Sequence, residues 1–429
     1  MSEPDHKRPP GFIRATLKEQ ARLARIRPVA PPALLFRTGR WWVRTVLRES
    51  APQLAAGGLA VTGGLSALGA TRGRLGLAAA LVASGFTAWE LRMAWLAHKS
   101  VERIDEALEG LEQGDDDVPR VPRSHIVIPP LMFVTRAVTR RRGVKFGEGD
   151  GMSLRLDVYR NAADDPRDDV LSPAVVQVHG GGWLSGSRYE QGIPLLNHLA
   201  AIGWVGFNID YRLSPQATWP DQIVDVKRAI AWVRENAEEL GIHPEMICIT
   251  GGSAGGHLTA LAGVTENDPD FQPGFEDADT SLAAAVPFYG VYDLTNANAF
   301  YYRQMREWVL ETIVFKRPFD EARDVYRDAS PTCRAHADAP PFLVIHGDRD
   351  TLVPMTDARH FVERLRAVSH EPVRYVELPG AEHAFDLWPS ERSARVAEGI
   401  GRFLTAIAEA HGLGPVKSEV AAAAAMQAG

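Results

Sequence analysis

The chain has 429 residues, 45% of them hydrophobic and 24% charged, which is the composition of a globular protein with a large core. A net charge of −7 and a pI near 6.0 exclude the strongly basic surface of a nucleic-acid-binding protein, so we expect no nucleic-acid partner. Cys248 and Cys333 form no CxxC motif and no zinc-type cluster with histidine; we therefore expect no disulfide scaffold, no metal and no cofactor.

Residues 1–50 form a basic arm, with eleven lysines and arginines against four acidic residues. Two uncharged, Ala- and Gly-rich runs follow, at 52–70 and 75–89, and predict a hydrophobic helical hairpin within residues 51–98. Nineteen helical residues reach about 28 Å, roughly one hydrocarbon thickness. We expect this hairpin to insert in or lie on the bacterial cell membrane, with the basic arm on the cytoplasmic side. The alternative is that the two helices pack on each other or on the catalytic body of a cytoplasmic protein.

The next segment, residues 99–130, is expected to be an amphipathic helix followed by a linker. Apolar residues recur there at helical spacing: Val101, Ile104, Leu108 and Leu111. The stretch 114–130 mixes an acidic run with four prolines, which is typical of a linker. At the other end of the chain, residues 413–429 are low in complexity and are expected to form a flexible tail.

Between residues 131 and 412, short β-rich runs alternate with helical stretches. This alternation predicts an α/β catalytic domain with a mostly parallel central sheet flanked by helices. Strands are expected at 144–146, 154–159, 174–179, 205–210, 246–250, 283–289, 342–346 and 373–378. Helices are expected at 221–240, 258–264, 357–368 and 391–410. An aromatic-rich stretch, about 291–340, interrupts the alternation and is expected to be an insertion that walls or covers the site.

The sequence GGSAG, residues 251–255, fits the G-x-S-x-G pattern of a nucleophile elbow. A predicted strand runs into it and a predicted helix leaves it, as such an elbow requires, because the serine must stand on a sharp turn. A phosphate-binding loop is disfavoured, since no Lys-Ser/Thr pair follows the glycines. Ser253 is therefore the predicted nucleophile.

The sequence HGGGW, residues 179–183, follows another predicted strand. Three successive glycines are entropically costly unless the backbone itself does the chemistry. Backbone N–H groups that point into a pocket can hold the oxyanion of a tetrahedral intermediate. We expect the oxyanion hole to consist of the N–H groups of Gly181, Gly182 and Ala254.

A serine nucleophile needs a histidine to accept its proton and a carboxylate to orient that histidine. The motifs VIHGDRDTLVP and LPGAEHAFD end two successive predicted strands, and parallel sheets place their sites at the carboxyl ends of strands. His383 is the predicted base and Asp350 the predicted acid. Asp348 is the less favoured acid, because it is placed to bond the turn backbone.

We expect three other histidines to have structural rather than catalytic roles. His346 is expected to be a packing residue, His257 to face away from the site, and His179 to brace the oxyanion loop.

These motifs together resemble the α/β-hydrolase carboxylesterases, closest to the hormone-sensitive-lipase-like and feruloyl-esterase-like bacterial branches. HGGGW, DYRLSP, ITGGSAGGHL, APPFLVIHGDRDTLVP and PGAEHAF carry the resemblance, which covers about residues 140–410. It implies the α/β-hydrolase fold, here with an N-terminal helical hydrophobic extension, and the same roles for Ser253, Asp350 and His383. The chain departs from the lipase-like branch at Gly252, where that branch has an aspartate, so no branch-level substrate carries over.

The expected function is hydrolysis of a small-molecule or lipid carboxylic ester through an acyl-enzyme. Hydrolysis of an amide or peptide by the same triad is the alternative, since the triad does not distinguish the two. A catalytically silent scaffold is disfavoured, because such domains normally lose a catalytic residue and here all of them are present.

Overall fold

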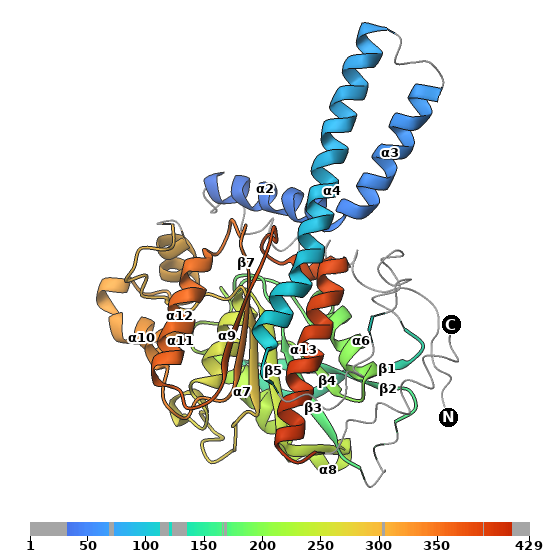
Figure 1. Ribbon diagram of the computed structural model, residues 1–429. Coiled ribbons are helices and arrows are strands. Elements are labelled where there is room, and N and C mark those ends of the chain that lie inside the picture. The colour runs from blue at the N-terminus through green and yellow to red at the C-terminus, as the bar shows by residue number, and fades with distance from the viewer. Residues whose placement is uncertain are drawn as a thin grey trace.

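The computed structural model describes residues 32–67, 73–111, 120–121, 135–164, 166, 170–302, 305–388 and 390–413. Most of the basic arm, most of the predicted linker and nearly all of the predicted tail lie outside these residues. Within them, an eight-stranded sheet forms the centre of the molecule, as Figure 1 shows.

The sheet has the order β1-β2-β4-β3-β5-β6-β7-β8. β2 pairs antiparallel with β1 and β4, whereas every other neighbouring pair is parallel. All eight predicted strands are present: β1 (Val138–Gly149), β2 (Met152–Asn161), β3 (Ser172–Val178), β4 (Val205–Ile209), β5 (Ile242–Gly252), β6 (Ala284–Phe288), β7 (Phe342–Gly347) and β8 (Val373–Leu378). This is the predicted α/β-hydrolase architecture. The inner strands β3 to β7 are buried along nearly their whole length, which is why their sequences read as continuous apolar runs.

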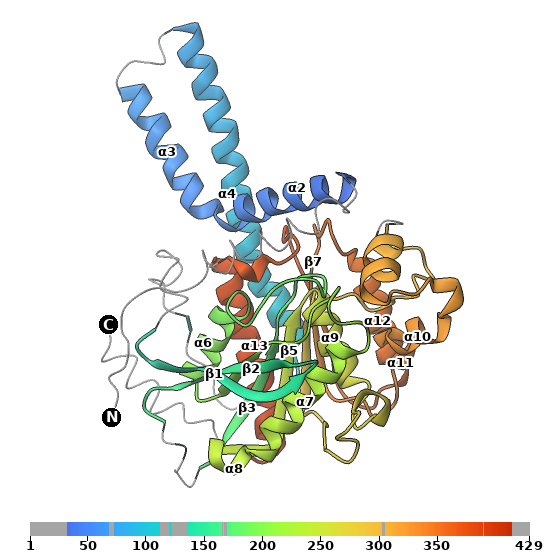
Figure 2. The ribbon, with the colours of Figure 1, turned by 180° about the vertical axis from the view of Figure 1, so that it is seen from behind.

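Helices cover both faces of the sheet and enclose one apolar core on each (Figure 2). The first core lies under α7 (Asp221–Glu235), α9 (Ala254–Gly263) and α12 (Met355–Val368). The second lies under α6 (Ile193–Ala201) and α13 (Glu391–Ala410). The predicted helix 221–240 divides at Asn236 into α7 and the short α8 (Ala237–Leu240).

The aromatic stretch predicted as an insertion connects β6 to β7 with short helical pieces. They are the π-helix η4 (Met305–Val314), the 3-10 turn η5 (Phe319–Glu321), α10 (Arg323–Asp328) and α11 (Pro331–Arg334). The stretch packs into the same core as α7 and α12 through Phe315 and Tyr326, whose rings stack at 4.2 Å. It is therefore part of the body, and a role in covering the site stays a prediction.

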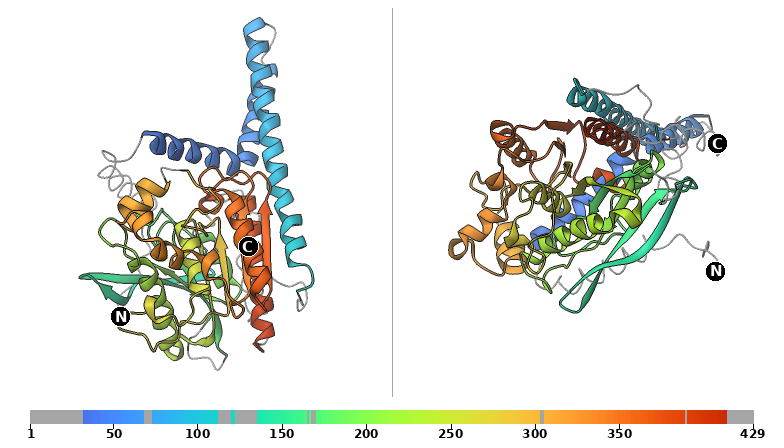
Figure 3. Two further views of the ribbon diagram at one scale, coloured as in Figure 1. Left: turned by 90° about the vertical axis from the view of Figure 1, so that its left-hand side faces the viewer. Right: turned by 90° about the horizontal axis from the view of Figure 1, so that it is seen from below.

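The N-terminal extension is more closely integrated with the body than the sequence indicated. α2 (Pro32–Glu49) occupies the second half of the predicted basic arm and lies across the top of the body in Figure 1. α3 (Ala51–Ala67) and α4 (Arg74–Leu108) form the expected hairpin, and the two helices come close together at Gly58, beside Thr87. Figure 3 shows this hairpin projecting away from the catalytic body.

The boundary expected near residue 98 does not exist, because α4 is one helix of 35 residues. Ion pairs between Lys99 and Glu102 and between Arg103 and Glu106 support the helix past this point. Ile104 and Leu108 are buried in the core under α13, so the amphipathic segment is the part of α4 that packs on the body.

The projecting part of the hairpin exposes many large apolar side chains. They include Leu59, Val61, Leu75, Leu77, Leu81, Val82, Phe86, Trp89, Leu91 and Trp95. Even so, none of the helices in the described part of the chain combines the length and the apolar character that crossing a bilayer requires. Contact of the hairpin with a membrane stays a prediction.

Candidate active site

Ser253 stands on the turn between β5 and α9, at the point where the sequence placed a nucleophile elbow. Its backbone has φ 60° and ψ −120°, a left-handed conformation that is costly for a residue with a side chain and is characteristic of such elbows. The Ser253 N–H donates to the carbonyl of Phe288 at 3.0 Å, which fixes the turn to the next strand. A Cβ at Gly255 would lie 2.2 Å from the carbonyl oxygen of Val178, so only glycine permits this close approach of helix and strand.

The structure brings Ser253, His383 and Asp350 into one hydrogen-bonded line. Ser253 Oγ lies 2.9 Å from His383 Nε2, and His383 Nδ1 lies 2.6 Å from Asp350 Oδ2. If Nδ1 carries the proton, His383 donates to Asp350 and Nε2 is free to accept from the serine hydroxyl. The three residues follow β5, β7 and β8, whose carboxyl ends meet at one edge of the sheet.

The Asp350 side chain is held as an anion by its surroundings. Burial alone would raise its pKa, but His383, His346 and their hydrogen bonds outweigh burial and hold the pKa of Asp350 below its ordinary value. Its other oxygen, Oδ1, accepts from the N–H groups of Leu352 and Val353 at 2.9 and 2.8 Å. The carboxylate therefore has a fixed orientation as well as a fixed charge.

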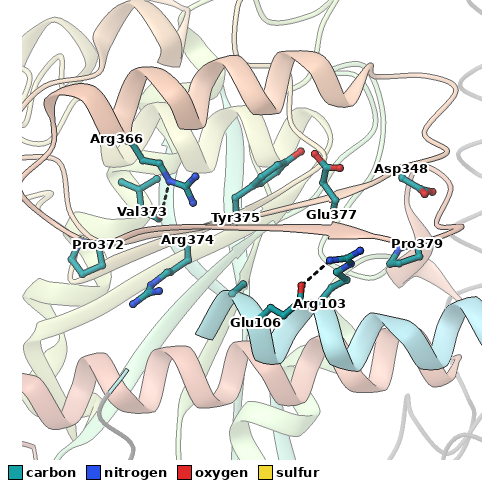
Figure 4. Close-up of a pocket in the computed structure, with 11 residues that line it drawn as sticks. Arg103, Glu106, Asp348, Arg366, Pro372, Val373, Arg374, Tyr375, Glu377 and Pro379 are labelled. Atoms are coloured by element: carbon teal, nitrogen blue, oxygen red, sulfur yellow. Dashed lines mark hydrogen bonds and ion pairs between the residues drawn. The ribbon is translucent and has the colours of Figure 1, made fainter. Parts of the chain in front are cut away.

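Asp348 lies on the other side of the same turn. Its Oδ1 accepts from the Gly380 N–H at 2.7 Å, so it bonds the turn backbone. It also lines a polar groove between α4 and the edge strand β8, shown in Figure 4. Three arginines of this groove already have partners among the described residues: Arg103 bonds Glu106, Arg366 bonds Val373, and Arg374 bonds Glu109. The groove lining includes none of the three aligned residues.

The HGGGW loop turns back beside Ser253 with left-handed conformations at Gly181 (φ 113°) and Gly182 (φ 64°). No hydrogen bond joins the N–H of either glycine to another described residue, so both remain available to a ligand. Ala254 is the first residue of α9, where a backbone N–H has no partner within the helix. The Gly180 N–H, by contrast, donates to the side-chain oxygen of Gln191, so Gly180 is not an oxyanion donor.

The other histidines lie away from the reacting atoms. His179 stacks on Tyr211 at 4.3 Å and contacts the Gly180 carbonyl through Nδ1, which braces the glycine loop. His257 bonds the Ala329 carbonyl at 2.7 Å, and burial lowers its pKa to about 4, so it is a neutral core residue. His346 is buried, and its Nε2 contacts both the Val353 carbonyl and Asp350. His346 thus supports the acid as well as packing, a role that the sequence did not indicate.

A second buried polar group, which sequence reasoning missed, lies under the oxyanion loop. Gln191 Nε2 donates to the Tyr289 hydroxyl at 2.8 Å, and that hydroxyl donates to Asp386. Burial raises the pKa of both Asp386 and Tyr289, which favours a shared proton over two charges. Through its oxygen, Gln191 holds Gly180 and hence the start of the loop.

This group explains the departure at Gly252. A Cβ at this position would lie 2.5 Å from Gln191 Nε2 and 2.6 Å from the Tyr289 hydroxyl. The space that an aspartate would need is therefore occupied by the amide and the phenol. The unusual glycine was the one signal in the sequence that something else fills this site.

The fold defines the class of protein as an α/β hydrolase, and comparisons with known proteins define the family. The BD-FAE family model matches residues 156–365. Esterase LipC of Mycobacterium tuberculosis is 44% identical over 304 residues, which cover 70% of this chain and 74% of LipC. The chain belongs to the BD-FAE family of α/β-hydrolase esterases, which confirms the resemblance to the α/β-hydrolase carboxylesterases.

Other relatives agree with this placement. The probable carboxylic ester hydrolase LipM, also of Mycobacterium tuberculosis, is 47% identical over 279 residues, covering 65% of this chain and 63% of LipM. The match thus spans just under two thirds of LipM. Among solved structures, a truncated carbohydrate esterase from gut microbiota superposes with a TM-score of 0.54 at 25% identity, over 63% of this chain and 96% of that one. Thermogutta terrifontis esterase 2 phosphonylated by sarin superposes with a TM-score of 0.50 at 28% identity, over 60% of this chain and 88% of that one.

Proposed function

We propose that the protein is a serine esterase that cleaves carboxylic esters through an acyl-enzyme on Ser253. The observation that carries this proposal is the unbroken line from Ser253 Oγ through His383 to Asp350. The family supports it, since the matched relatives LipC and LipM are named as an esterase and a probable carboxylic ester hydrolase.

In the first half of the reaction, Ser253 Oγ attacks the ester carbonyl while His383 Nε2 takes the hydroxyl proton. Asp350 stabilises the imidazolium that forms, and the N–H groups of Gly181, Gly182 and Ala254 hold the oxyanion. The C–O bond to the alcohol then breaks, and His383 returns the proton to the leaving oxygen. The dipole of α9 adds partial positive charge beside Ala254.

In the second half, a water gives a proton to His383 and attacks the acyl carbon. The second tetrahedral intermediate uses the same N–H groups; its C–Oγ bond then breaks, and His383 returns the proton to Ser253 Oγ, which releases the carboxylic acid and free enzyme. Each step thus uses only side chains and N–H groups of this chain together with the ester and water, and the expectation of no cofactor stays a prediction.

Turnover of a matched ester panel tests this function. We expect release of p-nitrophenol from the acetate, butyrate or palmitate ester, and much slower release of p-nitroaniline from the corresponding anilides, because an amine is the poorer leaving group. Anilide turnover equal to or faster than ester turnover would contradict an esterase in favour of an amidase. A folded protein that turns over neither set would indicate a scaffold.

For the hairpin we propose that α3 and the projecting part of α4 contact a lipid surface. α3 carries no charged residue, and large apolar side chains are exposed along the hairpin. At its base, α2 presents exposed Trp42 and Val43 beside exposed Arg40, the mixture of apolar and basic residues that suits a headgroup boundary. An apolar surface of this extent calls for a partner, and lipid fits both parts of it.

Co-flotation with vesicles tests this contact. The full chain should float with vesicles of phosphatidylglycerol and phosphatidylcholine, and Leu81→Glu/Val82→Glu should stay at the bottom of the gradient, because both side chains are more than 60% exposed. Val170→Glu, which changes an exposed apolar residue of the catalytic body, is the matched control and should float. A wild-type dimer that the hairpin variant turns into a monomer, without any flotation of either, would instead identify a second copy as the partner.

A further inference from the structure

Helix α2, which lies outside the region matched by the family model, is bonded directly to the loop that carries His383. Trp41 Nε1 donates to the main-chain carbonyl of His383 at 2.7 Å, and Thr45 Oγ1 lies 3.2 Å from the same oxygen. The indole ring also meets the His383 imidazole edge-on, with ring centres 6.0 Å apart. A segment more than 300 residues away in sequence therefore touches the residue proposed as the base.

The contact continues along the second half of α2. Arg48 donates to the Gly380 carbonyl at 2.8 Å, at the start of the same loop. One position further, Glu49 forms an ion pair with Arg392 in which both side chains are fully buried, and it also accepts from Ser390 Oγ at 2.7 Å. Residues 41, 45, 48 and 49 are spaced so that they lie on one face of α2. This face contacts the His383 loop and the start of α13.

In the described part of the chain, the hydrogen bonds to the His383 carbonyl come from α2 alone. On the other side, Glu382 accepts from the N–H groups of Thr351 and His383, which ties the loop to the turn that carries Asp350. Ala384, directly after His383, is left-handed with φ 56°, so the chain reverses sharply there. A histidine on such a reversal keeps its orientation only if its own peptide groups are held.

We propose that α2 is a positioning element of the active site, in which Trp41 and Thr45 hold the His383 carbonyl so that the imidazole stays aligned between Asp350 and Ser253. Neither side chain is assigned a chemical step. Both act through the main chain of His383, whose Nε2 must stay within hydrogen-bond reach of Ser253 Oγ for proton transfer. This inference rests on the proposed function for its kinetic consequence, but its geometry does not depend on any substrate.

The kinetic test uses full-length Trp41→Phe/Thr45→Val, which removes both donors and keeps an aromatic ring at position 41 and a β-branched side chain at position 45. We expect kcat for a p-nitrophenyl ester to fall about tenfold with KM nearly unchanged, because misplacing a base weakens the chemical step rather than binding. Trp232→Phe is the matched control: it removes the indole N–H of a partly buried tryptophan on α7, away from the active site and from the hairpin, and should retain the wild-type kcat.

A second readout does not need turnover. The proton between His383 Nδ1 and Asp350 should give a far-downfield proton resonance in the wild type, and this resonance should broaden or shift upfield in Trp41→Phe/Thr45→Val but not in Trp232→Phe. If the wild type shows no esterase activity while the resonance behaves as described, the proposed function fails and the positioning role stands. An unchanged kcat with an unchanged resonance would overturn the inference. So would a lowered melting temperature with a normal resonance and a normal kcat per folded molecule, since α2 would then only stabilise the fold.

Discussion

Ser253→Ala is expected to lower kcat/KM for a p-nitrophenyl ester by about 10⁵- to 10⁶-fold, because the covalent route disappears and only binding and oxyanion stabilisation remain. The half-buried serine makes one side-chain hydrogen bond, to His383, so its loss removes little folding energy. The melting temperature should stay close to that of the wild type. The positive φ of the elbow is kept by its anchor on Phe288, which alanine does not disturb.

The control for this variant is Ser185→Ala. The Ser185 hydroxyl donates to the Gly181 carbonyl at 2.9 Å, so it supports the oxyanion loop without touching Ser253 or His383. We expect a loss of less than about tenfold, the scale of one hydrogen bond that supports a loop. Activity of Ser253→Ala within about tenfold of the wild type would contradict the assigned nucleophile.

Asp350→Asn is expected to lower kcat by about 10⁴-fold, the scale seen when a triad carboxylate becomes an amide. An amide at this position can offer its N–H₂ to His383 Nδ1, which favours the wrong tautomer and places a proton on Nε2. The N–H groups of Leu352 and Val353 would then hold the remaining amide oxygen, so the turn should stay folded. The effect should fall on kcat, with KM little changed.

Asp348→Asn is the matched control two residues away. Its amide oxygen can still accept from the Gly380 N–H, and its side chain faces the polar groove rather than His383. We expect kcat within a few-fold of the wild type. Equal losses in the two variants, or a larger loss in Asp348→Asn, would move the acid to Asp348.

The catalytic domain was largely predictable because its signals are local. Strands buried on both faces read as apolar runs, and the residues at their carboxyl ends are where a parallel sheet collects its site. The sequence favoured Asp350 over Asp348 as the acid because an aspartate in the position of Asp348 commonly hydrogen-bonds the backbone of its own turn.

What the sequence did not predict depends on long-range contacts. Nothing in residues 32–49 shows that Trp41 bonds a carbonyl in the loop of His383, since an indole donor has no fixed spacing from its acceptor. α4 was divided near residue 98 because its apolar character changes there, from a projecting half to a half that packs on α13. Gly252 marked a difference from the lipase-like branch, but only the fold shows that Gln191 and Tyr289 fill the space.

The most direct measurement is peptide mapping of the wild-type protein after reaction with a fluorophosphonate, which phosphonylates an activated serine. We expect one adduct, on the peptide that joins β5 to α9 and contains Ser253, and a rate of labelling that falls in Asp350→Asn but not in Asp348→Asn. An adduct on another residue, or no adduct on a protein that hydrolyses esters, would contradict the assignment of Ser253 as the nucleophile.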